Sequence, residues 1–357
     1  MRLYRKTVGL GLVALLIATA LVACGQQPVE DATAGPDTPP AAEEATTGPG
    51  TPAADLSVEE HFQKGNDYIK NGQFDKAVAE FEAVLKADPE RISALTNLGV
   101  AYYNVGRLDE AIAQYQKALE IGPDDADIHS NMAAAYVQKN DLVQGMAEYQ
   151  KAIKINPELS QAHFGLAVVY LQQGQNDQAS EELLKFQKYD DGMDPIATAQ
   201  AYVYLGAIYL DEGELEKALV EYQKALQADP KLPSAHFGVG LVYAQLGQTD
   251  QAIKALEQFQ EYDDGLNPTM TAQAYVYLGA IYLDKGEPEK ALVEYQKALQ
   301  VDPKLPAAHF GAGRAYAQLG QTDQAIKALE QFQQYDDGLD PTMTDQAAQL
   351  LKQLKGQ

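Results

Sequence analysis

Residues 92–125 read ISALTNLGVAYYNVGRLDEAIAQYQKALEIGPDD. Apolar residues recur in both halves of this stretch at the spacing of an amphipathic helix, and each half contains a small residue, Gly99 or Ala111. Two helices approach closely only where side chains are small, and Pro123 ends the second helix because proline lacks a backbone donor. The stretch therefore predicts a hairpin of two helices.

The same pattern recurs along the chain from Val58, and every copy has a tyrosine at its eleventh position. The predicted units are 58–91, 92–125, 126–159, 160–198, 199–232, 233–271, 272–305 and 306–344. The tyrosines are Tyr68, Tyr102, Tyr136, Tyr170, Tyr209, Tyr243, Tyr282 and Tyr316. A fixed register of this kind indicates a repeat architecture.

The small residues, tyrosine, alanine, aromatic residue and proline at fixed offsets resemble the tetratricopeptide repeat (TPR). This resemblance implies an all-α fold, a right-handed α-solenoid of eight helix-turn-helix units over residues 57–344. Residues 345–357 place Ala347, Leu350, Leu351 and Leu354 on one helix face. We expect them to form a C-terminal cap helix, because a repeat stack cannot leave its last apolar face in water.

Two blocks of the chain, 199–271 and 272–344, are nearly identical, with nine mismatches that include Leu241 against Arg314. Duplication of a two-repeat unit explains this similarity and predicts that one surface is presented twice.

Units 160–198, 233–271 and 306–344 are longer than the others because each contains an acidic turn. Residues 189–195, YDDGMDP, are the first of these turns. The turns lack the alternating aspartates and distal glutamate of a calcium-binding loop. A helix stop with a left-handed glycine is the simpler interpretation.

The N-terminus has the pattern of a targeting signal. Residues 1–23 combine a basic start with an apolar stretch, as in a signal peptide, and Leu21-Val22-Ala23-Cys24-Gly25 resembles the lipobox of bacterial lipoproteins. The resemblance implies a lipidated Cys24, followed by a proline-rich, disordered tether over 24–56. An uncut signal anchor and an ordinary signal with an incidental cysteine are the alternatives. The predicted location is extracytoplasmic: the outer membrane or periplasmic face in a two-membrane host, and the outer face of the plasma membrane otherwise.

Composition excludes several classes of function. A net charge of −24 argues against nucleic acid, and a single cysteine excludes internal disulfides and cysteine-based zinc sites. The five histidines all occupy the fourth position of their units, where packing inside the hairpin is favoured over a metal ladder. Acidic residues such as Glu221, near Lys224, are expected to lie on solvent-exposed helix faces and not to form acid/base pairs. We therefore predict no catalytic residues, no metal and no cofactor.

The TPR resemblance implies that the first helices of successive units line a concave groove for a protein or peptide partner. Asn66, Asn97 and Asn131 lie where many TPR proteins hold a ligand's backbone. The positions of the family's carboxylate clamp hold Phe62, Asp127 and Asn131, so a C-terminal carboxylate is not the expected ligand.

Aromatic residues also follow the groove register. The remaining candidate groove residues are Tyr103, Phe164, Tyr204, Phe237, Tyr277, Phe310 and Arg314. Packing between units is the alternative for the phenylalanines, whereas Tyr204 and Tyr277 are expected to keep their hydroxyls at a wet edge.

These features together predict a membrane-anchored, extracytoplasmic scaffold for protein–protein interactions, in the assembly or organisation of envelope or secreted complexes. The alternative is a structural lipoprotein that forms homo-oligomers through its repeat stack.

Overall fold

The computed structural model describes residues 56–190, 192, 194–336, 338 and 340–356. The predicted signal peptide, Cys24 and nearly all of the tether lie outside these residues. The chain divides into two compact units, one ending at Tyr170 and the other beginning at Leu171. We call their described parts the N-terminal unit and the C-terminal unit and treat each by itself.

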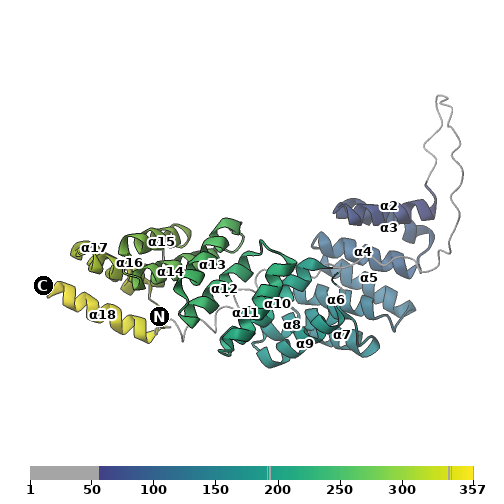
Figure 1. The fold of residues 1–357 in the computed structure, drawn as a ribbon. Coiled ribbons are helices and arrows are strands. Elements are labelled where there is room, and N and C mark those ends of the chain that lie inside the picture. Colours follow the sequence, from purple (N-terminus) through teal and green to yellow (C-terminus); the bar gives the residue numbers. More distant parts are fainter. Residues whose placement is uncertain (1–55, 191, 193, 337, 339, 357) are drawn as a thin grey trace, which may run out of the picture. The chain divides into compact units, whose positions relative to one another are not determined.

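All regular secondary structure in the described residues is helical (Figure 1). The N-terminal unit contains α2 (Val58–Lys70), α3 (Phe74–Ala87), α4 (Ile92–Asn104), α5 (Leu108–Ile121), α6 (Ala126–Gln138) and α7 (Leu142–Ile155). Helix α8 (Ser160–Gln172) spans the boundary. The C-terminal unit contains α9 (Asn176–Tyr189), α10 (Pro195–Asp211), α11 (Leu215–Ala228), α12 (Pro233–Leu246), α13 (Thr249–Tyr262), α14 (Pro268–Asp284), α15 (Pro288–Val301), α16 (Pro306–Gln318), α17 (Thr322–Tyr335) and α18 (Pro341–Lys355). The predicted all-α fold of stacked helical hairpins is confirmed.

The small residues of the repeat allow the two helices of a hairpin to touch. A Cβ atom added to Gly99 on α4 would lie 2.4 Å from the ring of Tyr115 on α5. The same addition at Gly240 on α12 would lie 2.7 Å from Leu256 on α13. Both distances are shorter than van der Waals contact, so glycine is required for this helix spacing.

The turn inside each hairpin needs a residue with positive φ at the fifteenth position of the unit. Glycine supplies it in all units but one: Gly72, Gly106, Gly174, Gly213, Gly247, Gly286 and Gly320. Asn140 takes the place in the remaining unit with a φ of 63°. Glycine reaches this region without steric cost, and asparagine is among the few other residues that tolerate it.

Each acidic turn is held by its own side chains. The Asp190 carboxylate accepts hydrogen bonds from the Thr198 hydroxyl over 2.5 Å and from the Gly192 amide over 3.1 Å. Gly192 has a φ of 73°, and Asp194 caps α10. The other two turns repeat this arrangement through Asp263 with Thr271, and Asp336 with Thr344. The helix-stop interpretation accounts for these turns, and no cluster of metal-binding side chains occurs in the described residues.

Helices after these turns begin earlier than predicted. α10, α14 and α18 start at Pro195, Pro268 and Pro341, four residues before the predicted unit or cap boundaries. Proline at a helix start leaves no backbone donor unpaired, and the preceding Asp or Asn side chain accepts from the first-turn amides. Part of each longer unit therefore extends the next helix.

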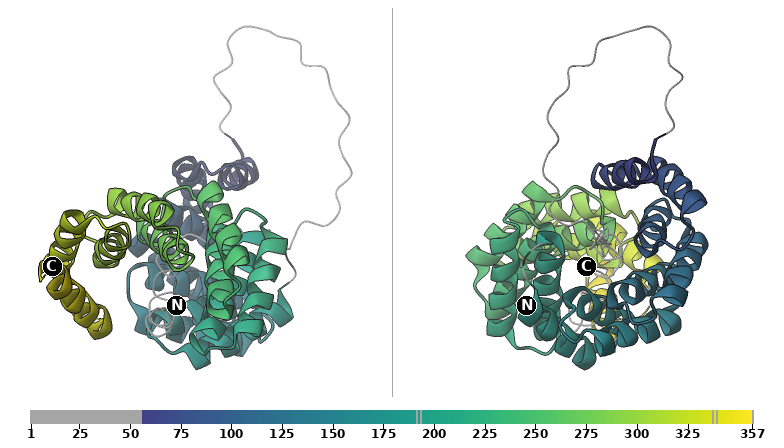
Figure 2. Two further views of the ribbon diagram at one scale, coloured as in Figure 1. Left: turned by 60° about the vertical axis from the view of Figure 1, so that its left-hand side comes forward. Right: turned by 90° about the vertical axis from the view of Figure 1, so that its right-hand side faces the viewer.

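The cap helix is confirmed. Ala347, Leu351 and Leu354 of α18 are buried with Phe310 and Phe332 in one cluster, and α18 runs beside α17 (Figure 2). None of the helices in the described residues has the length and apolar character needed to cross a membrane.

Candidate functional site on the first-helix faces

The first helices of successive hairpins contact one another in series. In the N-terminal unit these helices are α2, α4 and α6, and in the C-terminal unit they are α10, α12, α14 and α16. The second helix of a hairpin contacts the first helix of the next, as α11 does with α12 and α15 with α16. Each unit thus has a face built only from first helices, which we call its first-helix face.

The N-terminal first-helix face carries buried polar side chains. The Asn97 amide is fully buried and donates a hydrogen bond to the Asn66 side-chain oxygen over 2.8 Å. These two asparagines therefore bind each other across α2 and α4, while Asn131 on α6 is half-buried. Tyr103 is buried in the core of this unit. Burial, and then the neighbouring Asp125, raises the pKa of Asp127 at the start of α6.

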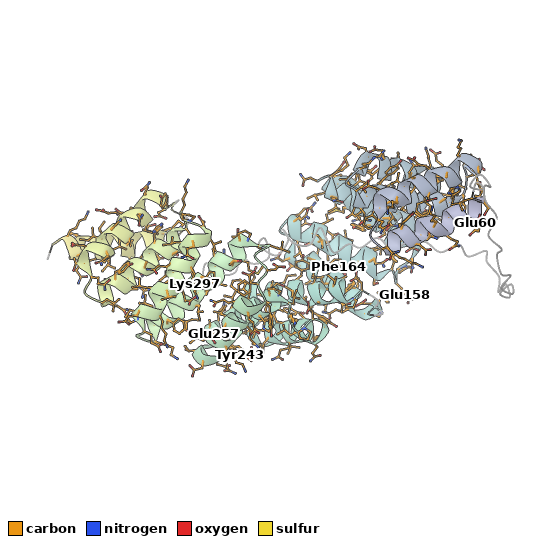
Figure 3. The ribbon with its side chains drawn as sticks, turned by 90° about the horizontal axis from the view of Figure 1, so that it is seen from above. Glu60, Glu158, Phe164, Tyr243, Glu257 and Lys297 are labelled. Atoms are coloured by element: carbon orange, nitrogen blue, oxygen red, sulfur yellow. The ribbon has the colours of Figure 1, made fainter. Side chains whose placement is uncertain are left out.

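The phenylalanines of the groove register are core residues. Phe237 is buried, with its ring centroid 5.6 Å from that of Phe259 and 5.9 Å from that of Tyr277. The ring centroids of Phe310 and Phe332 are likewise 5.6 Å apart. Phe164, labelled in Figure 3, is buried within the N-terminal unit. Phe237 also packs against the next unit through Tyr277, the alternative left open by the sequence, and Phe310 packs with residues of α18.

Tyr204 departs from its expected wet edge, because its side chain is only 2% exposed. The unit before Tyr204 has Leu183 at its twenty-fourth position, and the unit before Tyr277 has Leu256 there, so this position does not account for the difference between the two tyrosines. Tyr277, which follows Leu256, is half-buried and stays partly accessible. Arg314 is half-buried on α16, with its guanidinium 5.7 Å from the centre of the Phe310 ring.

Histidines at the fourth position have structural partners. Nε2 of His163, His236 and His309 lies 3.0 Å from the carbonyl oxygen of the proline six residues earlier. A carbonyl only accepts, so each Nε2 donates. These bonds fasten the start of a first helix to the turn before it.

The expectation of a solvated Glu221 is wrong. Its carboxylate is buried, and it accepts from Gln187 on α9 over 3.1 Å and from Lys224 over 2.8 Å. The glutamate therefore joins neighbouring hairpins, which sequence alone does not reveal because the partner lies 34 residues away.

Asp211 and Tyr222 are among the residues of the C-terminal unit with a buried polar atom that lacks a hydrogen-bond partner in the described residues. Asp211 ends α10, and its buried Oδ1 has no hydrogen-bond partner in the described residues. Tyr222 on α11 is fully buried, and its hydroxyl is also unpaired within that part of the chain. The Tyr222 ring lies between Gly206 on α10 and Gly238 on α12.

The charge of Asp211 affects the ionisation of Tyr222. Burial, and then the charge of Glu212, raises the pKa of Asp211 to about 7. Burial, and then the charge of Asp211, raises the pKa of Tyr222 well above its usual value. The charge on Asp211 therefore adds to the cost of ionising the buried Tyr222 hydroxyl.

The equivalent residues of the second block, 272–344, are in a different environment. Asp284 and Tyr295 occupy the equivalent positions, Asp284 is exposed, and both residues have partners. The residue after Asp284 is Lys285, whose ammonium group lies 2.9 Å from Asp250.

Sequence reasoning missed Asp211 and Tyr222. A signal existed: the thirteenth position of the unit holds Lys, Asn or Gln in six units and Asp only at 211 and 284. The burial that distinguishes the two aspartates depends on neighbouring helices and carries no local signature.

Comparisons with known proteins agree with this architecture. Models of the tetratricopeptide repeat match residues 62–126, 133–174, 206–247, 233–265, 279–320 and 307–337. The repeats are tetratricopeptide repeats. A TPR stack of this kind is a scaffold for protein–protein interaction.

The curated relatives match part of this chain and a small part of their own length. Anaphase-promoting complex subunit 3 of Schizosaccharomyces pombe is 28% identical over 132 residues, which cover 37% of this chain and 19% of that protein. Protein O-mannosyl-transferase TMTC1 of Homo sapiens is 34% identical over 102 residues, 29% of this chain and 11% of its own length. Since the matches span less than a fifth of either relative, they carry no whole-protein activity to this chain.

Solved structures with a similar fold include the APC/C hetero-tetramer Cut9–Hcn1, with a TM-score of 0.56 and 16% identity over 82% of this chain and 55% of that one. PilF of Pseudomonas aeruginosa has a TM-score of 0.53 and 19% identity over 61% of this chain and 94% of its own. At these identities the likeness concerns the fold alone.

Proposed function

We propose that this TPR protein is a lipid-anchored scaffold outside the cytoplasm that docks a protein partner on its first-helix faces, in the assembly or organisation of envelope or secreted complexes. The observation that carries the docking role is the serial contact of α10, α12, α14 and α16. Four helices in sequence provide a long, continuous face, which suits an extended segment or a partner helix.

The anchoring part of the proposal rests on the sequence around Cys24. The lipobox resemblance supplies the acyl chains, and the proline-rich stretch after it suits a tether. Each buried methylene contributes about 0.8 kcal/mol, so several acyl chains hold a protein firmly at a membrane.

Site-specific photocrosslinking in the native host tests the docking role. The reactive group is placed at Tyr277, which is half-buried on α14, and at Glu216, which is exposed on α11, as control. Capture of a distinct protein from position 277 but not 216 is the expected result. Crosslinking of the protein only to itself would favour the homo-oligomer, and the absence of any product from position 277 would overturn docking at this face.

A substitution gives an independent reading. Tyr277→Ser should weaken capture of that partner while leaving the helical circular dichroism signal unchanged, because the half-exposed ring offers contact area at a first-helix face. Tyr204 is unsuitable for this purpose, since its burial makes any truncation a stability mutation.

A further inference from the structure

One arginine on the C-terminal first-helix face has an aromatic neighbour but no carboxylate. We propose that Arg314 on α16 binds a glutamate or aspartate side chain of an extended partner segment lying along this face. This inference rests on the proposed docking function and specifies one chemical feature of the partner.

The other two arginines of the described residues show what Arg314 lacks. In both, a guanidinium nitrogen lies 3.0 Å from a glutamate oxygen. The guanidinium carbon also lies 3.8 Å or 4.3 Å from the centre of an aromatic ring. The glutamate and the ring belong to Glu59 and Phe62 for Arg91, and to Glu110 and Tyr102 for Arg107.

Arg314 has only the aromatic contact. Its guanidinium carbon lies 5.7 Å from the centre of the Phe310 ring, and it makes no ion pair with any carboxylate of the described residues. α16 contains no acidic residue, and Asp284 at the end of α14 has partners of its own. A guanidinium has five donors in a planar fork that fits a carboxylate. Arg314 therefore keeps this fork open to a ligand.

Arg314 lies on the side of α16 that faces away from the second helices. A Cβ atom at Gly311 would lie 2.2 Å from the Tyr295 ring on α15, and one at Gly313 would lie 2.8 Å from Leu329 on α17. Successive residues of a helix are about 100° apart, so Arg314 lies about 60° from Gly311 and about 100° from Gly313. This places it outside the sector of α16 that faces α15 and α17.

Burial along α16 agrees with this orientation. The residues that face the second helices are at most 5% exposed: Ala308, Ala312 and Ala315. The residues on the same side as Arg314 that are half-buried or exposed are Ala307, Ala317 and Gln318. Since Arg314 is itself half-buried, a ligand can reach its guanidinium from solvent.

The first block has no such site. Leu241 occupies the equivalent position on α12 and is 2% exposed. First helices contact α12 on both sides, through α10 and α14, whereas α16 is the last helix of the series. Arg314 is the only lysine or arginine on α10, α12, α14 and α16. The face therefore has one basic position, at one end.

A carboxylate side chain suits this position better than other anions do. A single arginine cannot neutralise a nucleic acid or another polyanion, and the net charge of −24 repels both. Arg91 and Arg107 already pair with carboxylates while they contact a ring, so this protein shows the same combination twice. A side chain of an extended segment can reach Arg314 wherever the segment ends, because the face continues over α14 and α12.

Fluorescence anisotropy of the full chain with labelled acetyl-(Ala-Glu)4-amide tests the site, and acetyl-(Ala-Gln)4-amide is the uncharged control. The net charge of −24 repels the acidic peptide, so its binding reports a local cation and not general attraction. We expect the wild-type chain to bind the glutamate peptide about tenfold more tightly than the glutamine peptide at physiological salt.

Two substitutions assign this preference to the arginine. Arg314→Leu installs the residue of the first block and should abolish the preference, whereas Arg314→Lys keeps the charge without the planar fork and should retain only part of it. Arg107→Leu is the matched control and should change the preference less than twofold, because Arg107 already has Glu110. The thermal unfolding midpoint of each variant shows whether the fold is intact.

A third peptide separates the two sources of a carboxylate. Acetyl-(Ala-Gln)4 with a free C-terminus should bind no more tightly than its amide. Tighter binding of this peptide than of the glutamate peptide would assign Arg314 to a chain end and overturn the side-chain proposal.

The site is also overturned if the wild-type chain shows no preference for the glutamate peptide, if the preference survives Arg314→Leu, or if Arg107→Leu reduces it equally. Each of these results leaves the photocrosslinking assignment at position 277 standing. Absence of any crosslinked partner, in contrast, removes the docking function itself.

Discussion

The ring of Tyr222 fills the space that any side chain at Gly238 would need. A Cβ atom added to Gly238 would lie 2.3 Å from the ring, although the two residues belong to different hairpins. The same relationship joins Tyr149 to Gly165, and Tyr295 to Gly311. In these three pairs, adjacent hairpins therefore pack through a tyrosine ring of one hairpin against a glycine of the next.

Gly238→Ala should destabilise the protein by about 1–3 kcal/mol, because the added methyl group forces the Tyr222 ring to move. The free energy of urea unfolding measures this. In combination with Tyr222→Leu, the alanine should cost less than it does alone, since the ring that it meets is gone. Simple additivity of the two changes would contradict the contact.

Tyr222→Phe should leave stability unchanged or raise it by up to about 1 kcal/mol. The hydroxyl is buried without a hydrogen-bond partner in the described residues, so its removal discards a desolvated group and keeps the ring. Tyr295→Phe is the matched comparison and should be the costlier change, because the Tyr295 hydroxyl is not among the buried unpaired groups of the described residues. A loss of more than 1 kcal/mol for Tyr222→Phe alone would show that the hydroxyl is bonded in solution.

Asn140→Gly should stabilise the protein by about 0.5–1 kcal/mol. Asn140 has a φ of 63° at the turn position that glycine occupies in all the remaining units. Gly106→Ala is the reciprocal control and should destabilise by a similar amount, since Gly106 has a φ of 79°. Thermal unfolding of both variants decides the matter, and a lower midpoint for Asn140→Gly would refute the strain.

Asp211 should make the protein less stable as the pH rises through neutrality. Burial and Glu212 raise the pKa of its carboxyl to about 7 in the fold, whereas it is about 4 in an unfolded chain. Between these values the folded chain holds a proton that the unfolded chain releases. The favourable contribution is therefore complete below about pH 4 and is lost by about pH 8.

Asp211→Asn removes this dependence. The variant should exceed wild type by about 1 kcal/mol at pH 8, a value that allows for solvent screening of the half-buried group, and the gap should close toward pH 4. Urea unfolding of both proteins at several pH values gives the comparison, and parallel pH profiles would argue against a perturbed Asp211.

Cys24→Ser should release the protein from membranes into the soluble fraction of its host, because the serine cannot carry the thioether-linked lipid. Metabolic labelling with a palmitate analogue should fail in the same variant. Retention of Cys24→Ser in the membrane fraction would favour the uncut signal anchor.

The repeat register was readable because each unit makes the same local demands. Small residues at Gly99 and Ala111, and a proline such as Pro123, follow from helix contact and helix termination within one hairpin. The left-handed turn at the fifteenth position was equally visible in the sequence, as a column of glycines interrupted by Asn140.

The candidate groove was less predictable, because the repeat register tells which helix face a residue lies on but not how deeply its side chain is buried. Phe237 packs against Tyr277 of the next hairpin, and Tyr204 is buried, so the packing of neighbouring side chains decides how much of each ring stays accessible. Tyr204 is buried and its counterpart Tyr277 is half-buried, although both follow a leucine at the same unit position. Tyr222 fills its own junction against Gly238.

Sequence by itself determined the TPR hairpins, their order and the cap helix, since period, small residues and caps act over a few helical turns. Tertiary structure alone decided that Asn97 binds Asn66, that Glu221 is buried, and that Asp211 lacks a partner while its copy Asp284 has one. These outcomes depend on desolvation and on charges from residues tens of positions away. They are therefore set by the packing of several helices and not by local sequence.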